Sequence, residues 1–227
     1  MKNWKKYFFE FIVVFLGVTF GLLVEEYRES KQNLENYQFI LEAISNDLKN
    51  DKKEIQYPIE WAEKTASVLD SMISRKMSDK DYRKCTECRW TLMTTNSFQL
   101  NMSGYKLMSS GLEFSQIDNK ELLAEIEEFY SYFNHLFGIL NTNVDNNAMD
   151  NMLFVRDNCE WFGNSDLTDE NSVETIIDFL LNDKDFMRRA RHTRIIVKDN
   201  YLPYLKYTEE RIDELIEKIK NEQSKSS

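Results

Sequence analysis

The sequence predicts an all-α protein in which an N-terminal transmembrane helix continues into an antiparallel bundle of long helices. Two observations lead to this fold class. Glycine and proline are scarce, with 6 and 2 residues among 227, whereas β-sandwiches, barrels and nucleotide-binding folds need frequent turns or glycine-rich loops. The N-terminus also contains one long apolar stretch, and amphipathic helical spacing follows it through most of the chain.

The apolar stretch covers residues 7–24 and contains a single charge, Glu10. An α-helix of this length would span about 27 Å, close to the ~30 Å hydrocarbon core of a bilayer. Because basic residues tend to stay on the cytoplasmic side, the sequence predicts a cytoplasmic tail at 1–6, a membrane span at 7–24 and an extracytoplasmic remainder. The flanking charges behind this orientation are Lys2, Lys5 and Lys6 before the stretch and Glu25, Glu26 and Glu29 after it.

Residues 7–24 admit two other interpretations. A cleaved signal peptide would end in a small-residue cleavage site, but the LLVEEYRES that closes the stretch contains no A-x-A-like pattern. The core helix of a soluble protein would not need basic residues before it and acidic residues after it. An uncleaved signal anchor is therefore the preferred interpretation.

Three residues of the span are candidates for association with another membrane helix. Gly17 and Gly21 form a G-x-x-x-G pattern, which lets two helices approach closely. Glu10 has two interpretations. A carboxylate inside a membrane is costly and commonly functional, but Lys6, one turn earlier, could neutralise it.

The net charge of −10 is divided unevenly along the chain. Residues 1–24 contain three lysines and one glutamate, a charge of +2, so the remainder has a charge of −12. An acidic domain disfavours nucleic acid as a partner, because binding to phosphates needs clustered Lys and Arg. The predicted partners are the lipid bilayer and either another protein or a second copy of this chain.

The first predicted helix leaves the membrane without a break and runs from about residue 4 to about residue 56. Its apolar seam would pack either inside an intramolecular bundle or against a second copy as a parallel coiled coil. Pro58 suits the first turn of a second helix, which we expect to end near Lys76. The apolar seam of the first helix, in which apolar residues recur mainly at intervals of three and four, consists of Tyr27, Leu34, Tyr37, Leu41, Ile44, Leu48 and Ile55.

Helix-capping patterns predict the next elements. Ser78 and Asp81 resemble a capping box, so a third helix is expected over residues 79–94. Gly111 should end a short helix. Asp118, with Glu121 three residues later, predicts the start of an aromatic-rich helix that continues towards residue 154.

The C-terminal part is expected to return as a long helix, and residues 25–222 together form the predicted extracytoplasmic domain. Pro203 should kink the last helix near residue 200, because proline lacks a backbone N–H. The expected elements are a loop at 158–172, a short helix at 173–181, the long helix at 185–222 and a disordered tail at 223–227.

Three segments occur in a distinctive order along the chain. It begins with KNWKKYFFEFIVVFLGVTFGLLVEEYRE, continues with YKLMSSG at Tyr105–Gly111 and with IDNKELLAEIEEFYSYF from Ile117, and closes with a long helix rich in both charges. Over most of its length the chain resembles a bacterial family of single-pass membrane proteins that is classed only as a domain of unknown function. The resemblance implies an inner-membrane protein with a helical periplasmic domain, and it implies no catalytic residue, substrate or cofactor.

The cysteines form the only pattern with chemical promise. A disulfide between Cys159 and either Cys85 or Cys88 is one interpretation in an oxidising periplasm, and reduced, packed cysteines are another. A zinc site would need more ligands of the right spacing, and the chain has only two histidines, His135 and His192. A redox motif of the thioredoxin kind needs a βαβ setting. We therefore expect no metal and no cofactor.

Arg188, Arg191 and Arg194 lie three residues apart and would share one side of a helix. They could pair with acidic helices, or they could form a patch that docks an anion or a partner. Nucleophilic catalysis has no support, because Ser109-Ser110-Gly111 lacks the setting of a nucleophile elbow. Two histidines also leave few general bases near neutral pH.

The sequence thus predicts a membrane-anchored helical interaction or scaffold protein without catalytic activity. The alternative is an extracytoplasmic bundle that senses a ligand or a stress signal. Such a sensor would act through a membrane partner, because a six-residue cytoplasmic tail leaves no room for an output domain. A third hypothesis, a metal- or thiol-dependent enzyme, depends on Cys85, Cys88 and Cys159 alone.

Overall fold

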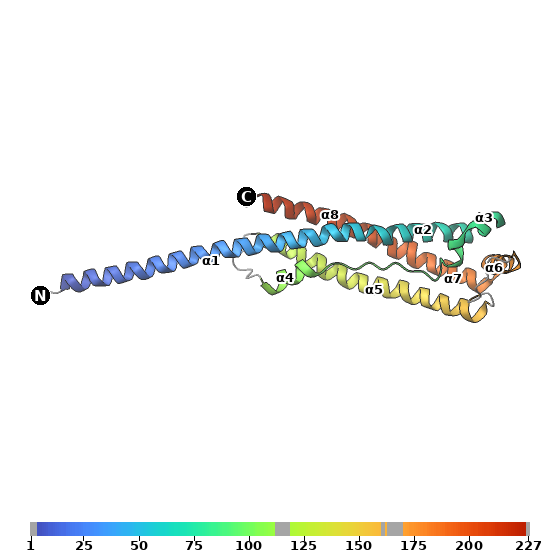
Figure 1. Cartoon of the computed structure of the whole chain (residues 1–227), viewed down its shortest axis with the longest axis horizontal. Helices are drawn as coiled ribbons and strands as arrows, with labels where there is room; N and C mark the ends of the chain where they lie inside the picture. The colour runs from blue at the N-terminus through green and yellow to red at the C-terminus, as the bar shows by residue number, and fades with distance from the viewer. Residues whose placement is uncertain (1–3, 112–118, 160–161, 163–169, 226–227) are drawn as a thin grey trace.

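The computed structural model describes residues 4–111, 119–159, 162 and 170–225. The described residues are predominantly helical and include no strand (Figure 1). The elements in chain order are α1 Trp4–Glu54, α2 Gln56–Ile73, α3 Asp79–Lys84, the 3₁₀ turn η1 Thr86–Arg89, α4 Ser103–Gly111, α5 Lys120–Asn158, α6 Glu170–Asn182, α7 Lys184–Arg194, the π-helix η3 Ile195–Tyr201 and α8 Leu202–Lys225. The predicted all-α class, with a long apolar N-terminal helix joined to a bundle, is confirmed.

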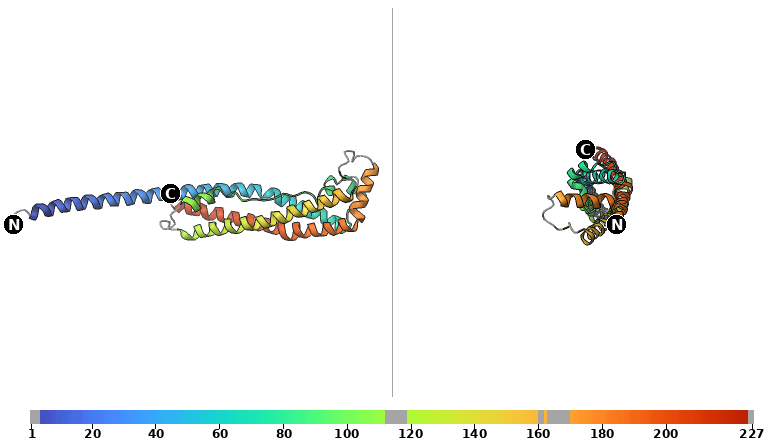
Figure 2. Two further views of the ribbon diagram at one scale, coloured as in Figure 1. Left: turned by 90° about the horizontal axis from the view of Figure 1, so that it is seen from below. Right: turned by 90° about the vertical axis from the view of Figure 1, so that its right-hand side faces the viewer.

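Three long rods make up the bundle, and α1 projects from one end of it (Figures 1 and 2). Helices α1 and α2 run end to end as the first rod, α5 is the second, and α7, η3 and α8 form the third. We call the end from which α1 projects the near end and the opposite end, where α3 and α6 lie, the distal end. The C-terminal end of α8 returns to the near end beside α1. One apolar cluster fills the near and central bundle, and a second fills the distal end.

The predicted seam of α1 is buried only from Tyr37 onwards. Tyr37 is 4% exposed, and the seam residues after it on α1 are fully buried, whereas Tyr27 and Leu34 are 73% and 48% exposed. The buried part packs mainly against α8 and α4. The seam therefore serves an intramolecular bundle, and the helix before Tyr37 stands outside that bundle.

The boundary between α1 and α2 is a weak break. Ile55 and Ile59 donate backbone hydrogen bonds to residues 51 and 55, which continues the helical ladder across the junction. Pro58 is the third residue of α2, and because proline has no backbone N–H it cannot donate in this ladder; it lies within the first turn, where helices tolerate proline. The predicted second helix is present, and it continues the direction of the first (Figure 1).

The predicted helix over residues 79–94 is wrong beyond Lys84. The capping box of Ser78 and Asp81 is present at its start, with both hydrogen bonds formed. After α3 and η1, residues 94–102 run without helical structure back along the bundle. Phe98 and Leu100 are 2% and 8% exposed, an alternation typical of extended backbone that buries one face.

Asn119 caps the N-terminus of α5, because its side chain accepts a hydrogen bond from the backbone N–H of Leu122. The predicted cap, Asp118, lies outside the described residues. The predicted aromatic-rich helix is present, and Phe129, Tyr130, Phe133 and Phe137 form a stripe that is at most 3% exposed, whereas Tyr132 is 49% exposed. Of the expected loop at 158–172, only Asn158, Cys159, Phe162 and the first residues of α6 are described.

The last rod contains a π-helix where a proline kink was predicted. Pro203 cannot donate a backbone hydrogen bond, and the wider turns of η3 precede it. The side-chain amide of Asn200 donates to the carbonyl of Ile195 at 3.2 Å and so satisfies one backbone acceptor there. The predicted disordered tail at 223–227 is also wrong in part, because α8 continues to Lys225.

Candidate functional site

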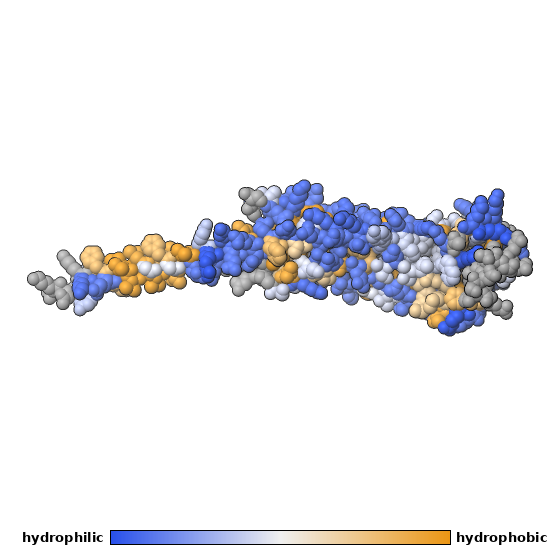
Figure 3. Space-filling model, in the orientation of Figure 1, coloured by the Kyte–Doolittle hydropathy of each residue, from blue (hydrophilic) through white to orange (hydrophobic). Residues whose placement is uncertain are grey.

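The apolar segment of α1 has no protein cover in this chain. Its best 18-residue window has a mean hydropathy of 2.2, and 0% of it is buried. Figure 3 shows it as a hydrophobic rod that extends away from the polar bundle. By length and composition this helix could cross a membrane.

The three candidate residues for helix association lie on this uncovered segment. Glu10 pairs with Lys6 at 3.9 Å, and both side chains are exposed, as the neutralised-pair interpretation predicts. An added Cβ at Gly17 or Gly21 would meet no atom within 4 Å. The glycine face is therefore open in a single chain.

A charged stalk connects the apolar segment to the bundle. Residues 25–36 are helical and exposed, apart from a half-buried Asn33, and they precede Tyr37, the first buried seam residue. Twelve helical residues at ~1.5 Å each make a rod of about 18 Å. Arg28 pairs with Glu25 at 2.5 Å, and Lys31 pairs with Glu35 at 3.9 Å.

The cysteines follow neither of the two predicted arrangements. Cys85 and Cys88 form a disulfide with each other, with their Cα atoms 5.4 Å apart, and Cys159 is a buried free cysteine. The tight η1 turn brings Cys88 back to Cys85, whose sulfur also accepts the Cys88 N–H at 3.2 Å. Cys159 instead follows the last turn of α5 and donates its backbone N–H to Val155. The expected link between the third helix and the long loop is therefore absent from the described residues.

Thiol counting checks this arrangement. Cys159 is 6% exposed, and burial raises the pKa of its thiol to about 11. Since the thiolate is the reactive form, the oxidised native protein should show no fast-reacting thiol, one thiol after unfolding, and three after unfolding with a reductant. Two or more reactive thiols in the native, unreduced protein would contradict the Cys85–Cys88 pairing.

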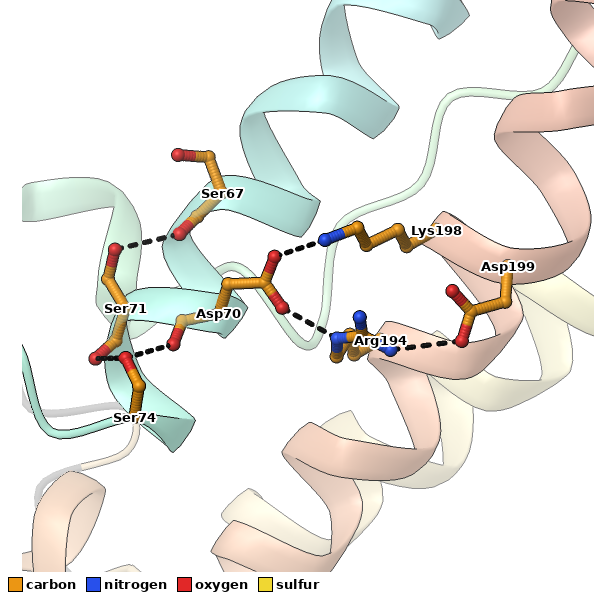
Figure 4. Close-up of polar contacts among 7 residues, drawn as sticks. All are labelled: Ser67, Asp70, Ser71, Ser74, Arg194, Lys198 and Asp199. Atoms are coloured by element: carbon orange, nitrogen blue, oxygen red, sulfur yellow. Dashed lines mark hydrogen bonds and ion pairs between the residues drawn. The ribbon is translucent and has the colours of Figure 1, made fainter.

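The predicted arginine cluster splits into separate environments. Arg194 lies between two carboxylates and bonds to Asp70 at 2.6 Å and to Asp199 at 2.9 Å, while Lys198 also bonds to Asp70 (Figure 4). These two cations lower the pKa of Asp70, Lys198 being the larger cause. The contact ties α2 to the third rod, as expected if the arginines pair with acidic helices.

The other members of the cluster do not extend this site. Arg188 pairs with Asp185 on its own helix at 3.1 Å and is exposed. Arg191 is exposed and has no ion pair with any residue in the described ranges. The nearby Ser71 and Ser74 hydroxyls donate to carbonyls of their own helix (Figure 4). The three arginines therefore do not converge on one anion site.

Two buried carboxylates on α1 hold the segment that precedes and begins α4. Asp47 accepts the backbone N–H of Gly104 at 2.6 Å, and Asp51 accepts that of Asn101 at 3.0 and 3.2 Å. Asp47 and Asp51 are 8% and 3% exposed. Burial raises the pKa of Asp51 to about 7, and the charges of Asp47 and Glu54 add to this effect. Neither acid was predicted as a site residue, and the available signal in the sequence is that Asp51 falls within the apolar seam, between Leu48 and Ile55.

A second polar network pins the irregular segment 94–102 to the other rods. The Tyr201 hydroxyl accepts the Phe98 N–H at 3.0 Å and lies 3.1 Å from the Asn96 carbonyl and 3.0 Å from the Asn141 side-chain oxygen. Asn141 in turn donates to the Phe98 carbonyl at 2.7 Å. One tyrosine and one asparagine thus bind both backbone groups of Phe98, and the single Tyr201 hydroxyl hydrogen is shared between the Asn96 carbonyl and the Asn141 side-chain oxygen.

We expect Tyr201→Phe to destabilise the protein, although phenylalanine has nearly the same size and shape as tyrosine. The Phe98 N–H would lose its acceptor inside the core, which typically costs about 1–3 kcal/mol. Urea unfolding should show this loss with an unchanged slope. Tyr204→Phe, at a partly exposed position one turn later, is the control. A Tyr201→Phe protein as stable as the parent would show that the hydroxyl is not part of the core network.

The described residues contain no group of three or more His, Cys, Asp or Glu side chains placed to hold a metal ion. Comparison of the chain with protein-family models, curated proteins and solved structures finds no match.

Proposed function

We propose that the protein is a single-pass membrane anchor that presents a helical interaction module on the outer side of a bacterial inner membrane, without catalysis. The carrying observation is the uncovered apolar helix that continues directly into the buried core of the bundle. A hydrophobic rod of this length is stable in a bilayer and unfavourable in water. Three lysines before it and acidic residues after it support the outward orientation.

The rigid stalk places the near end of the bundle about 18 Å beyond the span. Because α1 is one helix from Trp4 to Glu54, the bundle has a defined height above the membrane rather than a flexible tether. A partner would then meet the bundle at a fixed distance from the bilayer.

The near end offers an apolar surface for such a partner. Phe39 on α1 is 62% exposed and Leu107 on α4 is 44% exposed, and α1 and α4 pack against each other. Large apolar side chains exposed together commonly mark protein-interaction sites. We assign this surface to a membrane-proximal protein partner or to a second copy of the chain.

Site-specific photocrosslinking in cells tests the interaction. A photoreactive side chain at position 39 should give a discrete crosslinked band, while the same group at position 57 should not. Tyr57 and Phe39 are both 62% exposed, so exposure is matched and only location differs. Absence of a band at position 39 in native membranes would contradict an interaction at the near end.

A further inference from the structure

A polar groove of about 560 Å³ lies between α5 and the third rod, in the central and distal part of the bundle. Along α5 it extends from Leu140 to Asn151, twelve residues that span about 16 Å of helix. The facing wall is formed by α7, η3 and the start of α8. Its volume is within the usual range for small-molecule sites.

The walls of the groove are lined by side-chain amides. Asn143 and Asn146 are exposed on α5, and among the described residues neither side chain has a hydrogen-bond partner. Asn200 contributes an amide from the π-helix opposite. Each carboxamide offers two donors and one acceptor oxygen. Single π-helical segments occur frequently at functional sites, and here the segment forms one wall.

Arg189 is a fixed and unpaired cation at the distal end of the groove. Its guanidinium lies 4.4 Å from the centre of the Phe154 ring and donates to the Asn151 side chain at 3.2 Å. Its Nε is buried without a hydrogen-bond partner, and it forms no ion pair with a described carboxylate. Arg189 belongs to the same basic stretch of sequence as Arg188, Arg191 and Arg194, but the predicted patch did not include it. It is held in one orientation while part of its hydrogen-bonding capacity is unused.

Asp150 supplies an unpaired anion at the same end. Arg189 donates to its backbone carbonyl at 3.4 Å, yet the Asp150 carboxylate forms no ion pair with Arg189 or with any other described cation. Both side chains line the groove, and so does His192, one turn after Arg189. The distal end of the groove is therefore lined by one cation and one anion that form no ion pair with each other.

We propose that this groove binds a small zwitterionic α-amino acid. Its carboxylate would pair with Arg189, where a charge-assisted contact can use Nη2, which is not buried and has no hydrogen-bond partner among the described residues, and its ammonium group would pair with Asp150. The amides of Asn143, Asn146 and Asn200 would bind a polar side chain that points along the groove. A neutral sugar could use the amides, but it would leave both charges unpaired.

The test uses the full chain in detergent or nanodiscs, with a panel of common L-amino acids followed by calorimetric titration. L-Glutamine is the lead probe, because its carboxamide matches the amide wall. N-Acetyl-L-glutamine and L-glutaminamide, which lack the ammonium and the carboxylate respectively, should each bind at least about tenfold more weakly. Arg189→Gln should remove the preference for L-glutamine over L-glutaminamide. Asp150→Asn should remove the preference for L-glutamine over N-acetyl-L-glutamine.

Arg188→Gln and Asp185→Asn are the matched controls, since that pair lies exposed on α7 outside the groove. Both controls should keep the parent affinity and the parent preferences. The proposal is overturned if no amino acid binds up to about 10 mM. It is also overturned if both derivatives that lack a charge bind with the same affinity as L-glutamine. Binding of maltose with an affinity that Arg189→Gln leaves unchanged would overturn it as well.

Discussion

Replacing Gly104 with alanine should destabilise the bundle by about 1–3 kcal/mol or more. An added Cβ would lie 2.7 Å from the backbone nitrogen of Ile44, 2.8 Å from its Cα and 2.9 Å from the carbonyl carbon of Ala43. All three are backbone atoms of α1, so no side chain can rotate away. The change would also strain the hydrogen bond from the Gly104 N–H to Asp47.

Gly138→Ala is the matched control for this prediction. Gly138 is an exposed helical glycine in α5, and an added Cβ there meets no atom within 4 Å. Alanine favours a helix over glycine by roughly 0.5–1 kcal/mol, so this variant should be more stable than the parent. Thermal or urea unfolding should therefore give opposite signs for the two glycines. A stabilising effect at position 104 would show that α4 does not pack closely on α1.

Asp51 should make the protein less stable as the pH rises from about 4 to about 7. Burial raises the pKa of Asp51 from 3.8 to about 7 in the folded chain. Between these values the folded state holds a proton that the unfolded state has lost, so raising the pH favours unfolding. At about 1.4 kcal/mol for each unit of pKa, the shift corresponds to about 4 kcal/mol at most.

Asp51→Asn isolates this contribution from that of the other acids. The asparagine side-chain oxygen can still accept the Asn101 N–H, and no charge is buried. The variant should match the parent near pH 4 and exceed its stability by up to a few kcal/mol at pH 8. Glu42→Gln, which removes an exposed charge from the same helix, is the control. Parallel stability curves for Asp51→Asn and the parent would contradict a raised pKa at Asp51.

The regular parts of the fold were predictable because apolar spacing records which face of a helix is buried. The seam of α1 from Tyr37 to Leu48 and the stripe of α5 were read correctly for this reason. The course of the irregular segment 94–102 was not predicted, because its two inward residues, Phe98 and Leu100, are too few to show a period. Its course depends on Tyr201, Asn141 and the two buried acids, which lie far away in the sequence.

The candidate sites were harder to predict because they depend on which groups meet in space. The three-residue spacing of Arg188, Arg191 and Arg194 could not show that Arg194 faces Asp70 on α2. Nor could it show that Arg189, between them, stacks on Phe154 of α5. The cysteine pairing failed for a related reason. The tight turn that joins Cys85 to Cys88 is not encoded by any helical period.

The central claim is that residues 7–24 cross the membrane once and leave the bundle outside the cytoplasm. A specific protease site followed by an epitope tag, appended after Ser227, tests it in spheroplasts. The account predicts that added protease removes the tag from intact spheroplasts, and that the protein stays in the membrane pellet after alkaline carbonate extraction. A tag that is released only after lysis would contradict it.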